Sequence, residues 1–237
     1  MQKNKIQILS TKLVGETLIS IAAMYDILID EVSFIETEEI ITPTLQKRII
    51  ELSQQNVTVV FTSVNAVNAV NRLLPTKTFW KIFCIDHKTK KLVENIFGDE
   101  KIIGTADNAE QLAEKIIKNP CLQKVVFFCG DHRRDELPGK LKMNGIELEE
   151  LVVYKTIEKA HIISKVYDGI LFFSPSAVKS FFSVNTITDP TQIFAIGATT
   201  AEEAKLFTHS PIIIAEFPGK ENLVYQVIKH FSTIKTF

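Results

Sequence analysis

The chain has 237 residues, a formal net charge of −1 at pH 7, 46% hydrophobic residues and 23% charged residues. This composition excludes an intrinsically disordered chain, and the near-zero charge argues against a broad nucleic-acid-binding surface. No apolar run approaches the ~20 residues of a transmembrane helix, and the first five residues lead straight into a strand pattern, so we expect a cytoplasmic protein without membrane or nucleic-acid partners.

Strand and helix patterns alternate along the whole chain. The apolar spacing predicts strands at 6–9, 27–32, 57–61, 81–85, 101–104, 125–128, 146–154, 169–173, 193–196 and 212–215. It predicts helices at 16–24, 44–53, 66–74, 89–97, 109–118 and 135–144, then one ending near 182, one beginning at 200 and one beginning at 221. Such alternation is typical of parallel sheets covered by helices on both faces, whose ligands lie beyond the carboxyl ends of the strands.

The apolar pattern repeats within the chain, but the order of its parts differs between the two copies. Met24 and Met143 are 119 residues apart, whereas segment 63–67 precedes its counterpart 174–178 by 111 residues. The first spacing also relates Ile29 to Leu148, and the second relates 85–89 to 196–200 and Leu112 to Leu223. The repeat therefore predicts two α/β domains, one of which is a permuted copy of the other.

On this basis we expect two flavodoxin-like parallel-sheet domains. Domain 1 is discontinuous and combines residues 1–34 with 162–237, while domain 2 spans 37–157. Two extended crossings, at about 33–40 and 152–158, form a two-strand hinge between them. Few contacts cross such a linker, so hinge motion is expected.

Small polar residues gather where predicted strands end and helices begin. They are Thr62, Ser63 and Asn65 with Ala66, then Ser174 and Ser176, then Gly197, Thr199 and Thr200. The first N–H groups of a helix are unsatisfied and its dipole favours negative charge, so such residues either cap the helix or bind an anion. Capping is the simpler explanation for any one of them. Because five or six such turns are expected to converge on the facing ends of two sheets, the group predicts a crevice that binds many carboxylates.

Metal and nucleotide sites have no support in the sequence. Cys84, Cys121 and Cys129 lack a C-x-x-C spacing, and the histidines show neither metal-ligand spacing nor a partnered serine or cysteine. Neither the G-x-x-x-x-G-K-[ST] nor the G-x-G-x-x-G phosphate loop occurs. We therefore expect no metal and no cofactor.

Segment 125–156 contains the most informative pattern. A buried strand stops at Gly130 in a polar, basic turn, a helix with Pro138 in its first turn follows, and a second strand begins after Gly145. Gly130 is expected to let backbone amides at the helix start approach a ligand closely.

These residues also resemble a family pattern, G-x-x-x-R-x-x-L-P-x-x-L-x-x-x-G…V-Y-x-T, which is that of uroporphyrinogen-III synthase. The residues that carry the resemblance are Gly130, Arg134, Leu137, Pro138, Leu141, Gly145 and the run Val153-Tyr154-Lys155-Thr156. The polar turns after the other predicted strands are similar to further blocks of the family, so the resemblance covers most of the chain.

The resemblance implies that the chain cyclises hydroxymethylbilane, a linear tetrapyrrole with eight acetate and propionate groups. The substrate would lose its terminal hydroxyl to give an azafulvene, and the far ring would attack through its substituted carbon. A spiro intermediate would then reopen with ring D inverted, which gives uroporphyrinogen III. The resemblance implies no cofactor and suggests a monomer, and catalysis would depend on positioning and electrostatics.

Roles for individual residues follow from the resemblance. The phenol of Tyr154 is implied to help the terminal hydroxyl leave as water, although the pattern alone fits a half-buried strand tyrosine equally well. Arg134 either pairs bidentately with a propionate or holds the turn through a neighbour such as Asp135.

The sequence departs from the family pattern at two places. Segment 86–90 stands where the family usually has a glycine-containing segment ending in Thr-Ala, and it retains only Thr89. A carboxylate at Asp86 would repel an anionic ligand. Lys12 stands where many members have arginine, which keeps the charge but loses the planar fork. Thr89 and Lys12 are still among the residues that we expect to bind substrate.

Two other functions fit parts of the pattern. A non-catalytic, hinged two-domain module that binds an anionic small molecule would also use two α/β lobes joined by crossing strands. A regulatory protein built from receiver-like domains would need acidic residues at the strand ends, and segments 8–10 and 127–129 supply none. Product analysis with hydroxymethylbilane separates the enzyme from both.

Overall fold

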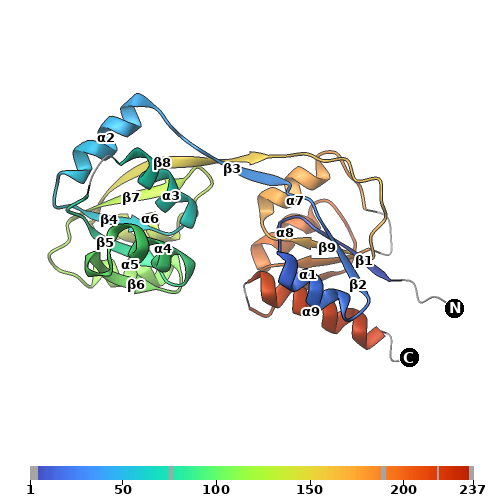
Figure 1. Ribbon diagram of the computed structural model, residues 1–237. Coiled ribbons are helices and arrows are strands. Elements are labelled where there is room, and N and C mark those ends of the chain that lie inside the picture. The colour runs from blue at the N-terminus through green and yellow to red at the C-terminus, as the bar shows by residue number, and fades with distance from the viewer. Residues whose placement is uncertain (1–4, 75–76, 188–190, 218, 235–237) are drawn as a thin grey trace. The chain divides into compact units, whose positions relative to one another are not determined.

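The computed structural model describes residues 5–74, 77–187, 191–217 and 219–234. The chain forms two compact units (Figure 1): unit 1 comprises Met1–Glu36 with Ile157–Phe237, and unit 2 comprises Thr37–Thr156. Residues 1–4, which were expected to open domain 1, lie outside the described residues.

Unit 1 is a five-stranded sheet with helices on both faces. Its elements are β1 (Ile6–Ser10), α1 (Glu16–Ala23), β2 (Ile27–Glu31), β9 (Gly169–Phe172), α7 (Pro175–Phe182), β10 (Gln192–Ala195), α8 (Ala198–Lys205), β11 (Ile212–Ile214) and α9 (Lys220–Ile234). The strands run in the order β11-β10-β9-β1-β2, and each neighbouring pair is parallel. Helices α1 and α9 pack on one face, and α7 and α8 pack on the other.

Unit 2 is a six-stranded sheet with the same layering. Its elements are β3 (Ile35–Glu39), α2 (Pro43–Ser53), β4 (Thr58–Phe61), α3 (Val64–Leu73), β5 (Lys81–Ile85), α4 (Lys88–Phe97), the 3-10 helix η1 (Asp99–Lys101), β6 (Ile102–Ala106), α5 (Ala109–Ile117), β7 (Lys124–Gly130), α6 (Glu136–Met143) and β8 (Glu147–Glu158). The strand order is β3-β8-β7-β4-β5-β6. Helices α2, α3 and α4 cover one face, and α5 and α6 cover the other.

The mixed α/β fold with parallel sheets agrees with the sequence prediction. The expected helices and strands are present, with ends displaced by a few residues. One segment differs from the prediction. Residues 99–101 form η1, and the strand predicted at 101–104 begins at Ile102 and ends at Ala106. Val57 lies before β4 and is only partly buried.

The two sheets share one strand order when the strands of unit 2 are counted from β7. Numbered in chain order, the strands of unit 1 lie in the order 2-1-3-4-5 across the sheet. The strands of unit 2 lie in the same order when β3 is left out and β7, β8, β4, β5 and β6 are numbered 1 to 5. In such a sheet the connections diverge between strands 1 and 3, and ligands bind at this switch point beyond the carboxyl ends. The switch point lies between β1 and β9 in unit 1 and between β7 and β4 in unit 2.

Apolar strands explain why each sheet is buried on both faces. The strands β4, β9 and β10 are buried at every position, as expected for central parallel strands. In unit 2 the rings of Phe61 and Phe128 stack at 5.3 Å, and Trp80 lies against Phe128 with its Nε1 donating to the Leu52 carbonyl at 2.8 Å. The buried indole is therefore satisfied.

The chain passes between the units twice, inside strands β3 and β8, which are neighbours in the sheet. The Ile40 N–H donates to the Val153 carbonyl at 2.9 Å. Lys155 pairs with Glu38 at 3.2 Å, and Lys159 pairs with Glu36 at 3.1 Å. These ion pairs are largely exposed and contribute little stability, so the backbone pairing defines this connection. No helix within the described residues is long and apolar enough to cross a bilayer.

Candidate functional site

A pocket of about 550 Å³ lies at the carboxyl edge of the unit 2 sheet. Its walls include Thr62 and Ser63 after β4, Gly130 at the end of β7, the loop that follows it, and Tyr154 of β8. Because β4 and β7 flank the switch point of this sheet, the pocket lies where parallel α/β sheets bind ligands.

Tyr154 lies in this pocket against Gly130. A Cβ added to Gly130 would come within 2.5 Å of the Tyr154 ring and 2.8 Å of its hydroxyl oxygen, so only glycine leaves room for the ring. The Tyr154 hydroxyl donates to the Oγ of Ser63 at 3.2 Å. The phenol is thus held between the ends of the two strands that flank the switch point.

Asp131 holds the backbone at Tyr154 and just after it. The Asp131 N–H donates to the Tyr154 carbonyl at 3.1 Å, and one Asp131 carboxylate oxygen accepts from the Thr156 N–H at 2.9 Å. Gly130 is the last residue of β7, and its φ is not positive. Its missing side chain accommodates the Tyr154 ring. The expectation that Gly130 also lets helix amides approach a ligand stays a prediction.

Two of the candidate serines are helix caps. The Oγ of Ser63 accepts from the Asn65 N–H at 3.1 Å, and that of Ser174 accepts from the Ala177 N–H at 3.1 Å. In each case the serine oxygen accepts, so its own proton is available to a ligand. Ser63 therefore caps α3, accepts from Tyr154 and lines the pocket at once.

The other candidates of the polar turns differ in exposure. The side chains of Thr89 and Thr200 are turned inward, with residue exposures of 6% and 2%, and Ala66 is fully buried. Thr62, Asn65, Ser176 and Gly197 are half-buried, and Thr199 and Lys12 are exposed. Where the side chain is buried, only the backbone N–H is left to meet a ligand.

The loop after β1 in unit 1 is held by hydrogen bonds to its backbone. Thr11 donates from its N–H and its hydroxyl to the Leu171 carbonyl at 3.1 and 2.7 Å. The Val14 and Gly15 N–H groups both donate to Glu31, and Lys220 donates to the Val14 carbonyl. Lys12 lies in this fixed loop beside the unit 1 switch point, and Ser174 follows β9 on the other side of it.

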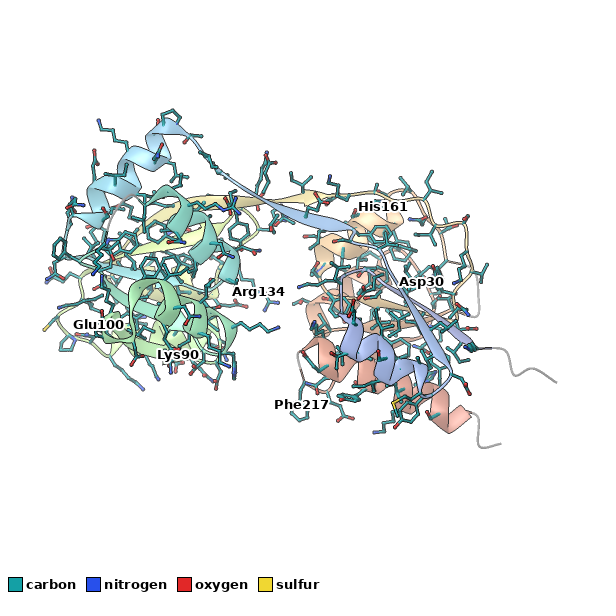
Figure 2. All side chains as sticks on the ribbon, viewed as in Figure 1. Asp30, Lys90, Glu100, Arg134, His161 and Phe217 are labelled. Carbon is teal, nitrogen blue, oxygen red and sulfur yellow. The ribbon has the colours of Figure 1, made fainter. Side chains whose placement is uncertain are left out.

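The two adjacent arginines of the pocket have different environments. The Arg134 side chain is 69% exposed, its nearest carboxylate is that of Glu136 at 3.8 Å, and it extends away from the ribbon (Figure 2). The Arg133 side chain is 28% exposed and pairs with Glu150 and, at 3.1 Å, with Asp135. The contact with Asp135 that we considered for Arg134 is therefore made by Arg133, and sequence reasoning missed both Arg133 and Glu150.

Acidic side chains also line this pocket. Of these, Glu110 pairs with Lys140 at 2.8 Å and Glu136 lies near Arg134. Asp107 also lines it. The pocket is therefore not uniformly positive, and an anion would bind beside Arg134 and the polar turns in preference to the Asp107 side.

A larger pocket of about 640 Å³ lies at the opposite, amino edge of unit 2. Its walls include the strand starts at Lys81 and Lys124 and the segments after α2 and α5. Helices present carbonyl groups at their C-terminal ends, and ligands of parallel sheets bind at the carboxyl edge. The smaller pocket around Tyr154 is therefore the candidate site.

Comparison with known proteins decides the family. The family model described as uroporphyrinogen-III synthase HemD matches residues 26–225, well over half of the chain. The chain belongs to the uroporphyrinogen-III synthase family. As a member it is an enzyme of the lyase class that acts on a tetrapyrrole in porphyrin and haem biosynthesis, and it forms uroporphyrinogen III.

Solved structures support the fold. Uroporphyrinogen-III synthetase from Helicobacter pylori is 17% identical with a TM-score of 0.65, over 95% of this chain and 99% of that one. A mutant uroporphyrinogen III synthase from the extremely thermophilic bacterium Thermus thermophilus is 12% identical with a TM-score of 0.63, over 96% of this chain and 99% of that one. At such identities the likeness concerns the fold alone.

The described residues contain no cluster of three or more His, Cys, Asp and Glu side chains that would hold a metal ion. Burial raises the pKa of the Cys84 thiol to about 12 and that of the Cys129 thiol to about 11, so both stay protonated at neutral pH. Neither is a nucleophile, and both are buried.

The departure from the family at segment 86–90 coincides with an unusual backbone conformation. His87, the residue before α4, has φ 66° and ψ −121° and makes no capping hydrogen bond with its side chain. Asp86 accepts from the His87 N–H at 3.3 Å and from the Thr105 hydroxyl at 3.1 Å. Only glycine adopts such positive-φ conformations without strain, so glycine suits this backbone better than histidine does.

We expect His87→Gly to stabilise the enzyme, because relief of a backbone strain of about 1–3 kcal/mol exceeds the roughly 0.5–1 kcal/mol entropic cost of glycine. The free energy of unfolding in urea should rise by about 1 kcal/mol. His209→Gly, at an exposed position without positive φ, is the control and should lower it. A His87→Gly variant no more stable than the parent would contradict the strain.

Proposed function

We propose that the pocket around Tyr154 binds part of hydroxymethylbilane and that the Tyr154 phenol assists departure of the terminal hydroxyl. The observation that carries this proposal is the packing of the Tyr154 ring against Gly130. This packing holds the phenol in a pocket at the carboxyl edge of the sheet, within hydrogen-bonding distance of Ser63. A tyrosine placed only for packing would not need a hydrogen-bonded hydroxyl in a pocket wall.

A phenol suits this step because it stays protonated at neutral pH and donates one hydrogen bond. As the bond between the terminal carbon and its hydroxyl breaks, negative charge develops on the departing oxygen. Donation from Tyr154 would stabilise that charge and supply the proton with which the group leaves as water. The terminal pyrrole that has lost its hydroxyl is then an azafulvene protonated at its nitrogen, and the far ring attacks its exocyclic carbon.

Substrate carboxylates would bind the polar turns of both units. In unit 2 the proposed groups are Arg134, Thr62, Ser63 and Asn65 with the N–H groups of Ala66 and Thr89, and in unit 1 they are Lys12, Ser174, Ser176, Gly197, Thr199 and Thr200. A guanidinium pairs with a carboxylate through two parallel hydrogen bonds, and the start of a helix favours negative charge. The uneven exposure of these residues implies side-chain contacts at some turns and backbone contacts at others.

The proposal also covers the domain organisation, the oligomeric state and the location of the enzyme. The two units are flavodoxin-like domains connected by a two-strand hinge, and their repeated strand order supports a common plan. The enzyme acts as a cytoplasmic monomer without nucleic-acid partners or a cofactor.

Product analysis tests the activity directly. Incubated with hydroxymethylbilane, the purified enzyme should yield uroporphyrinogen of the type III isomer, separated by chromatography after oxidation. Without enzyme the substrate closes unaided to the type I isomer. Type I product alone in the presence of folded enzyme would rule out the activity and would favour a binding module.

A further inference from the structure

Glu150 of β8 ties the loop between β7 and α6 to the sheet. Its side chain is 20% exposed, and both of its oxygens are engaged. One accepts from Arg133 Nε, and the other accepts from Lys142 Nζ at 3.0 Å. Arg133 also donates to Asp135 at 3.1 Å. The loop 131–135, which carries Arg134, is thus anchored through its neighbour Arg133.

The carboxyl group of Glu150 is ionised at neutral pH. Burial opposes ionisation, but hydrogen bonds from Lys142 and Arg133 outweigh it and hold the pKa of Glu150 below its ordinary value. A charged Glu150 balances a guanidinium that would otherwise be partly buried in the pocket wall without a partner of opposite charge on the strand.

Unit 1 has a glutamate at the equivalent position, which accepts from backbone N–H groups where Glu150 accepts from side chains. Glu31 precedes Glu150 by 119 residues, the spacing that also relates the buried Leu18 of α1 to Leu137 of α6. A Glu31 oxygen accepts from the Val14 N–H at 2.5 Å and from the Gly15 N–H at 3.0 Å. Val14 in turn precedes Arg133 by 119 residues. In unit 1 Glu31 of β2 holds the loop before α1, and in unit 2 Glu150 of β8 holds the loop before α6.

We propose that Glu150 is a positioning residue of the synthase reaction, which holds Arg133 in the pocket wall so that the loop presents Arg134 to a substrate carboxylate. Glu31 has the same role for the loop that carries Lys12. The inference rests on the proposed function of the pocket, since it assumes that Arg134 meets substrate there. Arg133, compensated by Glu150, supports the loop and does not itself bind substrate.

The expected kinetic signature is a change in KM. A substrate carboxylate that is bound far from the reacting carbon is bound equally in the ground state and the transition state. Weakening its interaction with Arg134 therefore raises KM and leaves kcat unchanged. Without Glu150 the Arg133 guanidinium loses its partner on β8 and is free to swing into the pocket, where it changes the path of the loop.

The test uses Glu150→Gln, which keeps the shape of the side chain and removes its charge. We expect KM for hydroxymethylbilane to rise about tenfold, with kcat within a factor of about two. Glu147→Gln is the matched control, since Glu147 lies on the same strand and is also paired, with Lys124 at 2.6 Å, but at the amino edge. Its kinetics should equal those of the parent.

A double-mutant cycle shows whether Glu150 acts through Arg133. Arg133→Met should raise KM by a similar factor, and Glu150→Gln combined with Arg133→Met should be no worse than either change alone. An unchanged KM in Glu150→Gln, a fall in kcat alone, or additive effects in the double variant would overturn the inference. If Glu150→Gln does not fold, as judged by its thermal unfolding, Arg133→Met alone decides by the same criterion.

Arg134→Gln separates this inference from the proposal on which it rests. If Arg134→Gln leaves KM unchanged, the pocket does not bind a carboxylate through Arg134, and the proposed function of the pocket fails. If Arg134→Gln raises KM while Glu150→Gln does not, binding stands and only the positioning role of Glu150 is overturned.

Discussion

Tyr154→Phe is expected to lower kcat about 10²-fold while KM changes by less than about threefold. The substitution removes one oxygen and leaves the ring on Gly130, so the shape of the pocket is kept. What is lost is the donor to the departing hydroxyl, which acts only as the bond breaks. Steady-state kinetics with hydroxymethylbilane, with type I and type III products separated, measures both constants.

Tyr167→Phe is the control for this experiment. Tyr167 is a buried tyrosine whose hydroxyl also makes a hydrogen bond, to Asp30 at 2.8 Å, but it belongs to unit 1 and does not line the pocket. Its loss should affect stability and leave kcat unchanged. A Tyr154→Phe enzyme with kcat within a factor of about two of the parent would remove the phenol from the mechanism.

Gly130→Ala is expected to be as damaging as the loss of the phenol, although it adds a single methyl group. The new Cβ would overlap the Tyr154 ring at 2.5 and 2.6 Å, so the ring must leave its place above β7 and its hydrogen bond to Ser63. A displacement of about 1 Å can cost about 10²-fold in rate, and overpacking lowers the free energy of unfolding by about 1–3 kcal/mol. Kinetics and urea unfolding on one preparation measure the two effects.

Gly139→Ala adds the same methyl group within α6 and is the matched control. Its nearest neighbour would be an Asp135 oxygen at 3.5 Å, which is ordinary contact. Alanine is the better helix former, so this variant should gain up to about 1 kcal/mol and keep its activity. In the Tyr154→Phe background, Gly130→Ala should reduce kcat little further, because the phenol that it displaces is already gone. A second full loss of about 10²-fold would contradict the shared mechanism.

The sequence was sufficient for the elements and their layering, because those depend on local periodicity. The buried run of β7 and the spacing of Leu137 and Leu141 on α6 leave little freedom in how this segment folds. Boundaries were harder: residues 99–101 carry two acidic residues and a lysine, and nothing local distinguishes the first residue of a strand from the turn of a 3-10 helix that forms there.

Several residues named from the sequence line the candidate pocket, but their contacts were missed. Polar residues after the strands of the switch point are visible in the sequence, and Ser63 and Tyr154 were both named from it. Arg133 and Arg134 are two arginines at adjacent positions, and only the neighbouring strand β8 decides which of them forms the ion pair with a glutamate of the sheet. That partner, Glu150, is separated from Arg133 by a complete helix, so no local pattern links them. The spacing of 119 residues links it to Glu31, but it does not say what either carboxylate contacts.

The discontinuity of unit 1 sets the order in which the ribosome delivers its parts. β1 is the strand at the switch point of that unit, and its partner β9 begins at Gly169, after all of unit 2 has been synthesised. At about 5–20 residues per second the N-terminal β1-α1-β2 segment waits on the order of 10 s for this partner. During that interval one edge of β1 is unpaired while unit 2 completes its own sheet, so the nascent chain has a period in which β1 is vulnerable to pairing with another chain.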